Sequence, residues 1–261
     1  MNCLIVNSLR DTAGKNIVQK LRENFSSIQN FKNFKFLEVK DEIIFSTIPE
    51  SVLEGIDLVV FASKHKSGSG RPTLTCHPVG NFGEAEMGGK SGELIPTSTI
   101  VLGNYLRSMH KLNAEKELGF EVSLEVTHHG PYLEKPSVFI EIGSTEKEWV
   151  NETAGEIIAK TIATETFRQS DDKAAIGIGG GHYAPDFTKL VLRKNYSFGH
   201  ICPLHNLQNL NENLLIQMIQ RSGASEIVLN WKGLKEHKER ILGLCNATGL
   251  PTKRAQNLLK E

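Results

Sequence analysis

The sequence has few cysteines, no long hydrophobic run and no excess of charge of either sign. No apolar stretch approaches the roughly 20 residues of a membrane-spanning helix. The first residues, 1–6, lack the basic segment of a secretory signal and predict a strand. We therefore expect a cytoplasmic protein without a membrane segment. In that compartment the four cysteines are expected as reduced thiols and not as a disulfide framework: Cys3, Cys76, Cys202 and Cys245.

Charges of the two signs are balanced, with 30 Lys and Arg residues against 30 Asp and Glu residues. The chain as a whole therefore has no net electrostatic attraction to nucleic acid. To bind a nucleic acid, the protein would need a local concentration of positive charge. A first basic group lies in a glycine- and serine-rich stretch, at Lys64, Lys66, Arg71 and Lys90. For a second group we favour ordinary solvated side chains: Lys232, Lys235, Lys238, Arg240, Lys253 and Arg254.

Short apolar runs alternate with segments of helical spacing, and this alternation predicts a layered α/β protein. The sheet is expected to be mixed, because the strands at 121–127 and 137–142 are joined by a loop too short for a helical crossover. No linker divides the chain, so we expect one domain over residues 1–261. The predicted strands are 3–7, 34–39, 57–62, 121–127, 137–142, 174–178 and 227–230. The predicted helices are 12–24, 98–118, 146–168, one that begins at Pro185, 214–221 and 235–247.

Residues 63–97 differ from the rest of the chain in composition and in hydrophobic pattern. They are rich in glycine and have no helical period. A loop of this length is uncommon in a compact domain and is usually functional or mobile. The stretch contains His65, His77 and the first basic group, so we expect it to contribute to a binding site.

Two adjacent histidines, His128 and His129, stand before Gly130 and Pro131. Neighbouring side chains of a strand point to opposite faces, so only one of the two could join a buried face if the strand continued. The Gly-Pro step marks a turn. The pair is therefore predicted at a strand end, where a loop can direct both rings into a cleft.

A glycine-rich turn, IGIGGGHYAP (176–185), follows a predicted strand and leads to His182 and a helix start. Such glycines allow close approach of the backbone to a ligand, and a helix N-terminus offers unpaired N–H groups to an anion. A dinucleotide fingerprint does not fit, since a histidine occupies the place of its last glycine, and the Gly-Lys-Ser/Thr of a phosphate loop is missing. The structural alternative is a turn that tightens a strand-to-helix connection.

Seven of the nine histidines lie in loops or at predicted strand ends, and α/β sheets bind ligands beyond the carboxyl ends of their strands. No HExxH or paired CxxC motif is present, but His128, His129 and His182 with a carboxylate such as Glu125 form a candidate open zinc site. Glu125 and Glu141 stand in strand patterns, where a buried carboxylate normally has a partner. Each could orient a catalytic histidine, bind a metal or form a structural ion pair.

Six segments together resemble the D-aminoacyl-tRNA deacylases of the archaeal and plant type. THHGP and GGGHYAP are specific in combination, whereas no role is transferred to GHICPLH with its His200, Cys202 and His205. The segments are SKHKSGSGRPTLTCHPVGNFG (63–83), GGKSGELIPTS (88–98), EVTHHGP (125–131), PSVFIEIGSTEKEW (136–149), IGGGHYAP (178–185) and GHICPLH (199–205).

This resemblance implies hydrolysis of the ester that joins a D-amino acid to the 3′ end of tRNA. It also implies dependence on zinc, broad tolerance of amino acids, and a three-layer α/β sandwich with a mixed central sheet. The implied fold is akin to that of peptidyl-tRNA hydrolases and nucleoside phosphorylases. The implied partner is the acceptor end of D-aminoacyl-tRNA, and we expect a monomer that binds neither DNA nor a membrane.

Hydrolysis of such an ester needs an activated water and hydrogen-bond donors for the oxyanion that forms. For the first need we predict His128, His129 and His182, with Glu141 as their carboxylate. For the second we predict the backbone N–H groups of Gly179, Gly180 and Gly181. The predicted contacts to the acceptor end of tRNA are Lys64, His65, Lys66 and Arg71.

Two other functions stay open at this point. One is a different hydrolase or a phosphorylase that acts on a nucleoside-like substrate, and the other is a non-catalytic RNA-binding protein. An acyl-enzyme is not expected, because the G-x-S-x-G motif is missing. Cys76 is the best candidate nucleophile, but it and His77 are neighbours in an extended segment and should point apart.

Overall fold

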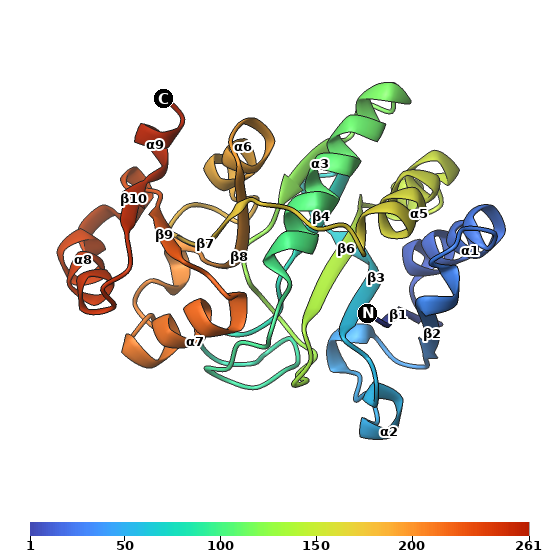
Figure 1. Cartoon of the computed structure of the whole chain (residues 1–261), viewed down its shortest axis with the longest axis horizontal. Helices are drawn as coiled ribbons and strands as arrows, with labels where there is room; N and C mark the ends of the chain where they lie inside the picture. Colours follow the sequence, from blue (N-terminus) through green and yellow to red (C-terminus); the bar gives the residue numbers. More distant parts are fainter. Residues whose placement is uncertain (261) are drawn as a thin grey trace.

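The strands of residues 1–260, which the computed structural model describes, form two sheets (Figure 1). Glu261, the last residue of the predicted domain, lies outside this part of the chain. The larger sheet has six strands in the order β2-β1-β3-β6-β4-β5, and the smaller has four in the order β10-β9-β7-β8. The strands are β1 (Cys3–Ser8), β2 (Phe34–Val39), β3 (Leu58–Lys66), β4 (Thr73–His77), β5 (Glu121–Leu124), β6 (Ser137–Ser144), β7 (Lys173–Ile178), β8 (Tyr196–Cys202), β9 (Glu226–Leu229) and β10 (Thr252–Arg254).

The larger sheet is mixed, as the sequence predicts. Strands β1, β2, β3 and β6 are parallel, whereas β4 runs antiparallel to β6 and parallel to β5. β4 therefore separates β5 from β6, the two strands from which the mixed sheet was inferred. The expectation of one continuous loop over residues 63–97 is wrong, because residues 63–66 extend β3 and residues 73–77 form β4. In the smaller sheet all pairs are parallel.

Capping residues define where the main helices begin. Asp11 caps α1 and Ser98 caps α3. The predicted helix 146–168 is divided, because the Asn151 side chain accepts a hydrogen bond from the backbone N–H of Ala154 and starts a new helix there. The α-helices are α1 (Thr12–Phe25), α2 (Glu50–Leu53), α3 (Thr99–Glu115), α4 (Glu146–Trp149), α5 (Glu152–Glu165), α6 (Pro185–Arg193), α7 (Glu212–Ser222), α8 (Lys238–Ala247) and α9 (Ala255–Leu258).

Short 3₁₀ helices lie between these elements at η1 (Phe31–Asn33), η2 (Ile43–Phe45), η3 (Leu204–Asn206) and η4 (Lys232–His237). Within residues 1–260, no helix combines the length and the apolar character that crossing a membrane would require.

The larger sheet is buried on both faces, which explains the continuous apolar run of β3. Val60 and Ala62 face α1, α3 and α5, whereas Val59 and Phe61 face η2 and α2 on the other side. The hydrophobic cluster under α1, α3 and α5 also includes residues of the smaller sheet, among them Phe198. The α/β class with a mixed sheet is thus confirmed, while the comparison with phosphorylases and peptidyl-tRNA hydrolases stays an expectation.

Candidate active site

Five histidines from four separate segments meet where the two sheets adjoin. They come from the end of β3, the last residue of β4, the loop after β5 and the turn between β7 and α6. The ring centroids of His128 and His182 lie 4.9 Å apart, and those of His65 and His182 lie 5.8 Å apart. The 63–97 stretch, which was expected to contribute to a binding site, thus supplies His65 and His77 to this cluster. The five are His65, His77, His128, His129 and His182.

Backbone hydrogen bonds attach the loop after β5 to residues of the smaller sheet and of the turn that follows β7. The N–H of Val126 donates to the carbonyl of His182 at 3.0 Å, and the N–H of Thr127 donates to the carbonyl of Ile201 at 3.0 Å. Strand β5 ends at Leu124, three residues earlier than predicted. These bonds fix the loop between the sheets and so position the histidines that follow it.

A left-handed backbone explains how two adjacent histidines reach one place. His129 has a φ of 44°, a conformation that few non-glycine residues adopt. The strand has ended, so the alternation of side chains no longer applies, and the rings of His128 and His129 lie 4.3 Å apart. Both therefore point into the same cluster.

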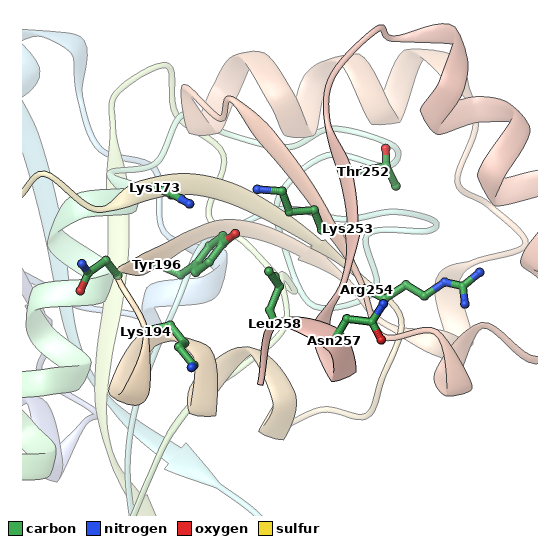
Figure 2. Close-up of a pocket in the computed structure, with 9 residues that line it drawn as sticks. Lys173, Lys194, Tyr196, Thr252, Lys253, Arg254, Asn257 and Leu258 are labelled. Atoms are coloured by element: carbon green, nitrogen blue, oxygen red, sulfur yellow. The ribbon is translucent and has the colours of Figure 1, made fainter. Parts of the chain in front are cut away.

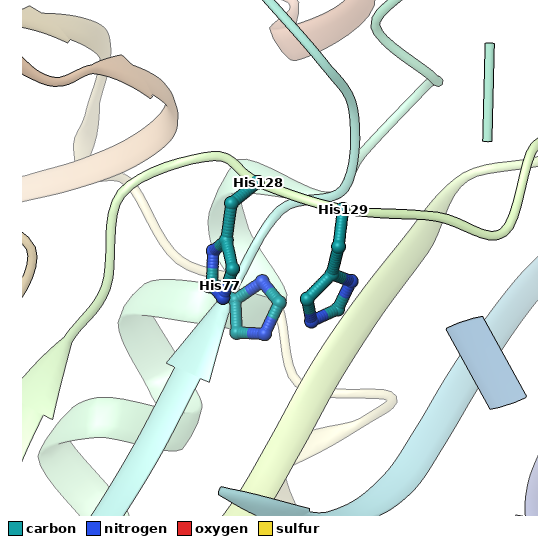
Figure 3. A group of neighbouring side chains, drawn as sticks. All are labelled: His77, His128 and His129. Carbon is teal, nitrogen blue, oxygen red and sulfur yellow. The ribbon is translucent and has the colours of Figure 1, made fainter. Parts of the chain in front are cut away.

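His77 completes a cluster of three histidines (Figure 3). Its ring centroid lies 4.2 Å from that of His128 and 4.9 Å from that of His129. One ligand nitrogen from each of the three can be chosen so that all lie within 4.8 Å of one another. His77 was not among the metal ligands predicted from the sequence. Its position at the end of a strand was hidden, because β4 was not predicted.

The hydrogen bonds of these three rings define their tautomers. In each ring Nδ1 lies at hydrogen-bond distance from a backbone carbonyl, which can only accept, so Nδ1 carries the hydrogen. Nε2 is then left with a lone pair. The carbonyl acceptors for His77, His128 and His129 are those of Pro78 at 3.0 Å, Val126 at 2.8 Å and Gly130 at 2.7 Å.

Burial keeps the three rings neutral. It lowers the pKa of His128 to about 4 and the pKa of both His77 and His129 well below the usual value for histidine. Nε2 of His77 is fully buried and has no hydrogen-bond partner among residues 1–260. A buried lone pair without a donor is costly, and a bound cation would satisfy it.

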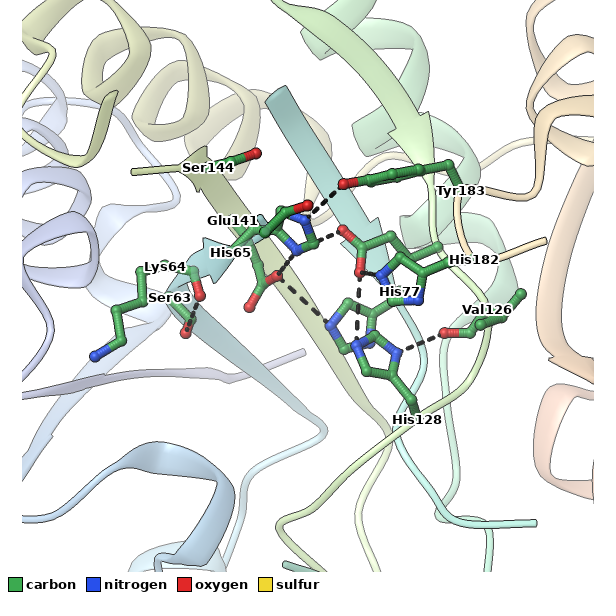
Figure 4. A network of polar contacts seen from close by, with 12 residues as sticks. Ser63, Lys64, His65, His77, Val126, His128, Glu141, Ser144, His182 and Tyr183 are labelled. Carbon is green, nitrogen blue, oxygen red and sulfur yellow. Dashed lines mark hydrogen bonds and ion pairs between the residues drawn. The ribbon is translucent and has the colours of Figure 1, made fainter. Parts of the chain in front are cut away.

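A second polar group adjoins the first and is centred on the buried carboxylate of Glu125. The histidines around this carboxylate, His65, His128 and His182, are labelled in Figure 4. One oxygen lies 3.1 Å from Nδ1 of His65, and the other lies 2.9 Å from Nε2 of His182 and 3.5 Å from Nε2 of His128. On its far side His65 meets the hydroxyl of Tyr183, 3.0 Å from its Nε2. Tyr183 was not predicted as a site residue, although it follows His182 directly in the sequence.

Opposite charges decide the protonation of this second group. Burial alone would raise the pKa of Glu125, but the contact with His182 and the charge of His65 lower it. Burial would lower the pKa of His65, yet Glu141 and Glu125 outweigh it and raise this pKa to about 10. At neutral pH Glu125 is therefore a carboxylate and His65 an imidazolium.

Glu141 lies on β6 between the two groups. One of its oxygens is 3.5 Å from Nδ1 of His65 and 3.9 Å from Nε2 of His77. Burial raises the pKa of Glu141 to about 7, with the nearby charge of Glu125 acting in the same direction. Both carboxylates predicted to need partners thus have histidine neighbours.

The predicted contacts to tRNA are only partly in place. The ammonium group of Lys64 points away from the histidines and pairs with Glu42 at 3.1 Å (Figure 4). Arg71 lies 3.7 Å from the carboxylate of Glu121. Lys66 is exposed at the end of β3. Their assignment to the acceptor end stays a prediction, since two of the three cations already face a carboxylate.

The glycine turn delivers His182 to the site, and its N–H groups are not equivalent. Gly179 and Gly180 both have a φ of 95°. The N–H of Gly179 already donates to the carbonyl of Cys202 at 2.8 Å, so it is not free to donate to an oxyanion. Within residues 1–260 the N–H groups of Gly180 and Gly181 have no acceptor, and these two stay candidates.

The histidines of GHICPLH lie outside the cluster. His200 is fully buried, with Nε2 2.9 Å from the carbonyl of Ile95 and Nδ1 3.1 Å from the hydroxyl of Thr127. His205 is exposed in η3. His200 therefore supports the loop that contains His128, and it does so from outside the site.

Known proteins of one family are similar to this chain over most of its length. A family model described as D-aminoacyl-tRNA deacylase matches residues 52–253. A D-aminoacyl-tRNA deacylase of Pyrococcus furiosus is 38% identical over 267 residues, which cover 95% of this chain and 97% of that protein. One of Methanocaldococcus jannaschii is 37% identical and covers 97% of this chain and 100% of that protein.

A longer relative and a solved structure extend the comparison. The D-aminoacyl-tRNA deacylase of Methanococcoides burtonii is 38% identical over 99% of this chain, which spans only 57% of that longer protein. The crystal structure of a conserved protein of unknown function superposes with a TM-score of 0.91 at 30% sequence identity. That match covers 100% of this chain and 97% of the other.

Proposed function

The chain belongs to the D-aminoacyl-tRNA deacylase family, and we propose that it hydrolyses the ester bond between a D-amino acid and the 3′ end of tRNA. The products are the free D-amino acid and tRNA, so the reaction removes D-amino acids before translation can use them. Such an enzyme works where tRNA is charged, in the cytoplasm. The observation that supports this most directly is the convergence of five histidines and two carboxylates at the junction of the sheets.

The three-histidine cluster fits the zinc ion that the resemblance implies. Catalytic zinc is often held by three neutral imidazoles, each oriented by a hydrogen bond from its other nitrogen. His77, His128 and His129 have this tautomer and this protonation state. They would hold the ion through Nε2, and a bound zinc supplies a water of lowered pKa and polarises a carbonyl.

This assignment changes the zinc ligands proposed from sequence. His182 and Glu125 were grouped with His128 and His129. Glu125 lies 3.5 Å from Nε2 of His128, and it also forms a group with His65 and His182. His77 takes the third position instead. The revised ligand set follows from β4, which places His77 beside the loop after β5.

His182 is the residue best placed to move a proton. Its side chain is 40% exposed, whereas Glu125 behind it is fully buried. We assign the hydrogen to Nε2, which lies 2.9 Å from the carboxylate, so that Nδ1 has a lone pair that can accept a proton from water. Glu125 orients the ring and stabilises the positive charge that this transfer creates.

Tyr183 supplies a donor on the same side of the site. Because His65 is an imidazolium, its Nε2–H donates to the Tyr183 oxygen. The hydroxyl hydrogen of Tyr183 is then directed away from His65. It can donate to the ester carbonyl oxygen as charge develops there, together with the N–H groups of Gly180 and Gly181.

The test is the incubation of the purified protein with matched D- and L-aminoacyl-tRNA, with and without a chelator. We expect release of the D-amino acid only, and loss of this activity after chelation that added zinc restores. Bound metal is measured separately in wild type and in a His77→Ala variant. Binding of tRNA without hydrolysis of either substrate would refute the proposed function.

A further inference from the structure

Helix α6 presents a basic stripe to solvent. Its buried face consists of Phe187, Thr188, Leu190 and Val191, which pack against the core. Its exposed face includes Lys189 and Arg193, which are four residues apart and therefore neighbours on the helix surface. Like charges at this spacing destabilise a helix unless something neutralises them.

A cationic pocket lies beyond the end of this helix, with Lys194 among its lining residues (Figure 2). The pocket has a volume of about 630 Å³ and lies between the start of β7, the start of β8, β10 and α9. Its lining includes the side chains of Lys173, Lys194, Lys253 and Arg254. The volume is in the range of a small-ligand site, and the lining favours an anion.

Few of these cations have an acidic partner within residues 1–260. Lys253 is paired with Glu226 at 2.8 Å, and Arg254 stacks on Trp231 with its guanidinium 3.8 Å from a ring centroid. Asp172, beside the pocket, is bound by Arg107. No described carboxylate forms an ion pair with the remaining four cations, which we call the basic track: Lys173, Lys189, Arg193 and Lys194.

Helix α6 leads from the candidate active site toward the basic track, whose first residue on it, Lys189, is the fifth residue of the helix. α6 starts three residues after His182 and its nine residues span about 13 Å, at about 1.5 Å of rise each. A stacked nucleic-acid strand rises by about 3.4 Å for each phosphate, so this length corresponds to a few nucleotides. A strand that ends at His182 and follows α6 would therefore pass these cations a few nucleotides from its end.

We propose that the basic track binds the phosphates of the tRNA acceptor strand a few nucleotides away from the ester. This inference rests on the proposed function, because it takes D-aminoacyl-tRNA as the substrate. In this proposal, α6 and the pocket provide affinity for the body of the tRNA, and the two histidine groups carry out the hydrolysis. It also explains how a chain of zero net charge binds a polyanion, since the positive charge is concentrated along one path.

The test compares two triple variants. Lys189→Ala, Arg193→Ala and Lys194→Ala together remove three of the four track cations. Lys32→Ala, Lys35→Ala and Lys40→Ala remove three exposed lysines near β2 as a matched control. Each is assayed on D-tyrosyl-tRNA and on the 3′ ester of D-tyrosine with adenosine, which has no phosphate. Alanine is a strong helix former, so α6 should persist.

For the track variant we expect KM on D-tyrosyl-tRNA to rise about tenfold or more with kcat unchanged, and binding of uncharged tRNA to weaken equally. The slope of log affinity against log salt should become shallower by about 2, from three lost phosphate contacts at about 0.7–0.9 each. Activity on the adenosine ester should equal that of wild type, and the control variant should match wild type throughout.

Wild-type affinity and salt slope in the track variant, or equal losses in the control variant, would overturn the proposal. If wild type hydrolyses neither substrate, the proposed function fails separately. In that case the binding of uncharged tRNA still tests whether the basic track contacts tRNA, because this measurement does not depend on hydrolysis.

Discussion

Cys76 and His77 are neighbours in β4, and their side chains point to opposite faces of the sheet. The thiol of Cys76 is fully buried in the cluster under α3, where its Sγ lies 3.6 Å from the carbonyl of Leu102. Burial raises the pKa of this thiol, so it is not the thiolate that nucleophilic catalysis requires. His77 points into the histidine cluster.

We therefore expect Cys76→Ala to keep most of the wild-type turnover on D-aminoacyl-tRNA. His182→Ala should lower kcat by about 10²–10⁴, the usual contribution of a general base. Steady-state assays and a melting curve for each variant test this. A trapped aminoacyl adduct, or a folded but inactive Cys76 variant, would show that water does not attack directly.

His200 gives the protein a dependence of stability on pH that is separate from catalysis. Burial lowers its pKa to about 4, whereas an unfolded histidine titrates near 6.5. Between these values the unfolded state binds more protons, so the free energy of unfolding rises with pH and falls on acidification. Going from pH 7 to pH 5 should cost about 2 kcal/mol through this one residue.

The measurement is the free energy of unfolding of wild type and of His200→Gln at several values of pH from 7.5 to 5. The variant will be less stable at neutral pH but should lose less stability on acidification. The other buried histidines titrate in both proteins, so the difference between the two slopes isolates His200. Equal slopes would refute its neutral, buried state.

At the scale of an element, the turn between β7 and α6 sets the position of His182. Gly179 has a φ of 95°, and a Cβ there would lie 3.1 Å from a Leu234 methyl group and 3.2 Å from the carbonyl of Asn230. Gly181 has no such φ, and a Cβ there would meet nothing within 4 Å. The two glycines thus form a matched pair.

Gly179→Ala should cost about 1–2 kcal/mol of stability, because an L-residue is strained at positive φ. It should also lower kcat by about tenfold or more, since a small displacement of a catalytic group is enough for that. Gly181→Ala should stay close to wild type in both respects. Unfolding and steady-state assays on the two variants test this prediction. Equal losses of stability and of kcat in both variants would mean that the turn does not position His182.

Elements with a clear period could be predicted, and those defined by tertiary pairing could not. The apolar run of β3 and the capped helices α1 and α3 follow from local pattern. β4 has only five residues between glycine-rich segments, and its strand character comes from pairing with β5 and β6. β8 contains a glycine and a buried histidine, which obscure its apolar pattern.

The same distinction applies to the site. The histidines at strand ends could be found from sequence, because strand ends of α/β sheets gather at one edge. Their division into two groups could not, since it depends on β4 placing His77 against the loop after β5. The ion pair of Lys64 with Glu42 also joins segments 22 residues apart that no local pattern connects.

At the scale of the whole molecule, the three-histidine cluster lies where both sheets are held together. His77 comes from the larger sheet, and the loop with His128 and His129 is bonded to the carbonyls of His182 and Ile201 beside the smaller sheet. A metal bound by all three would link these parts in the folded state only. Binding of this kind raises the free energy of unfolding in proportion to the logarithm of metal concentration.

We expect zinc to raise the Tm of the metal-free protein, with a gain of about 2.7 kcal/mol when free zinc is 100 times its Kd. His77→Ala should abolish this gain. His110→Ala, which removes an exposed histidine from α3, should leave it intact. Calorimetry on the three proteins, each with a chelator and with buffered zinc, measures this without any substrate. A zinc-dependent rise in Tm that survives in His77→Ala would mean that the ion binds elsewhere and that these three histidines are not its ligands.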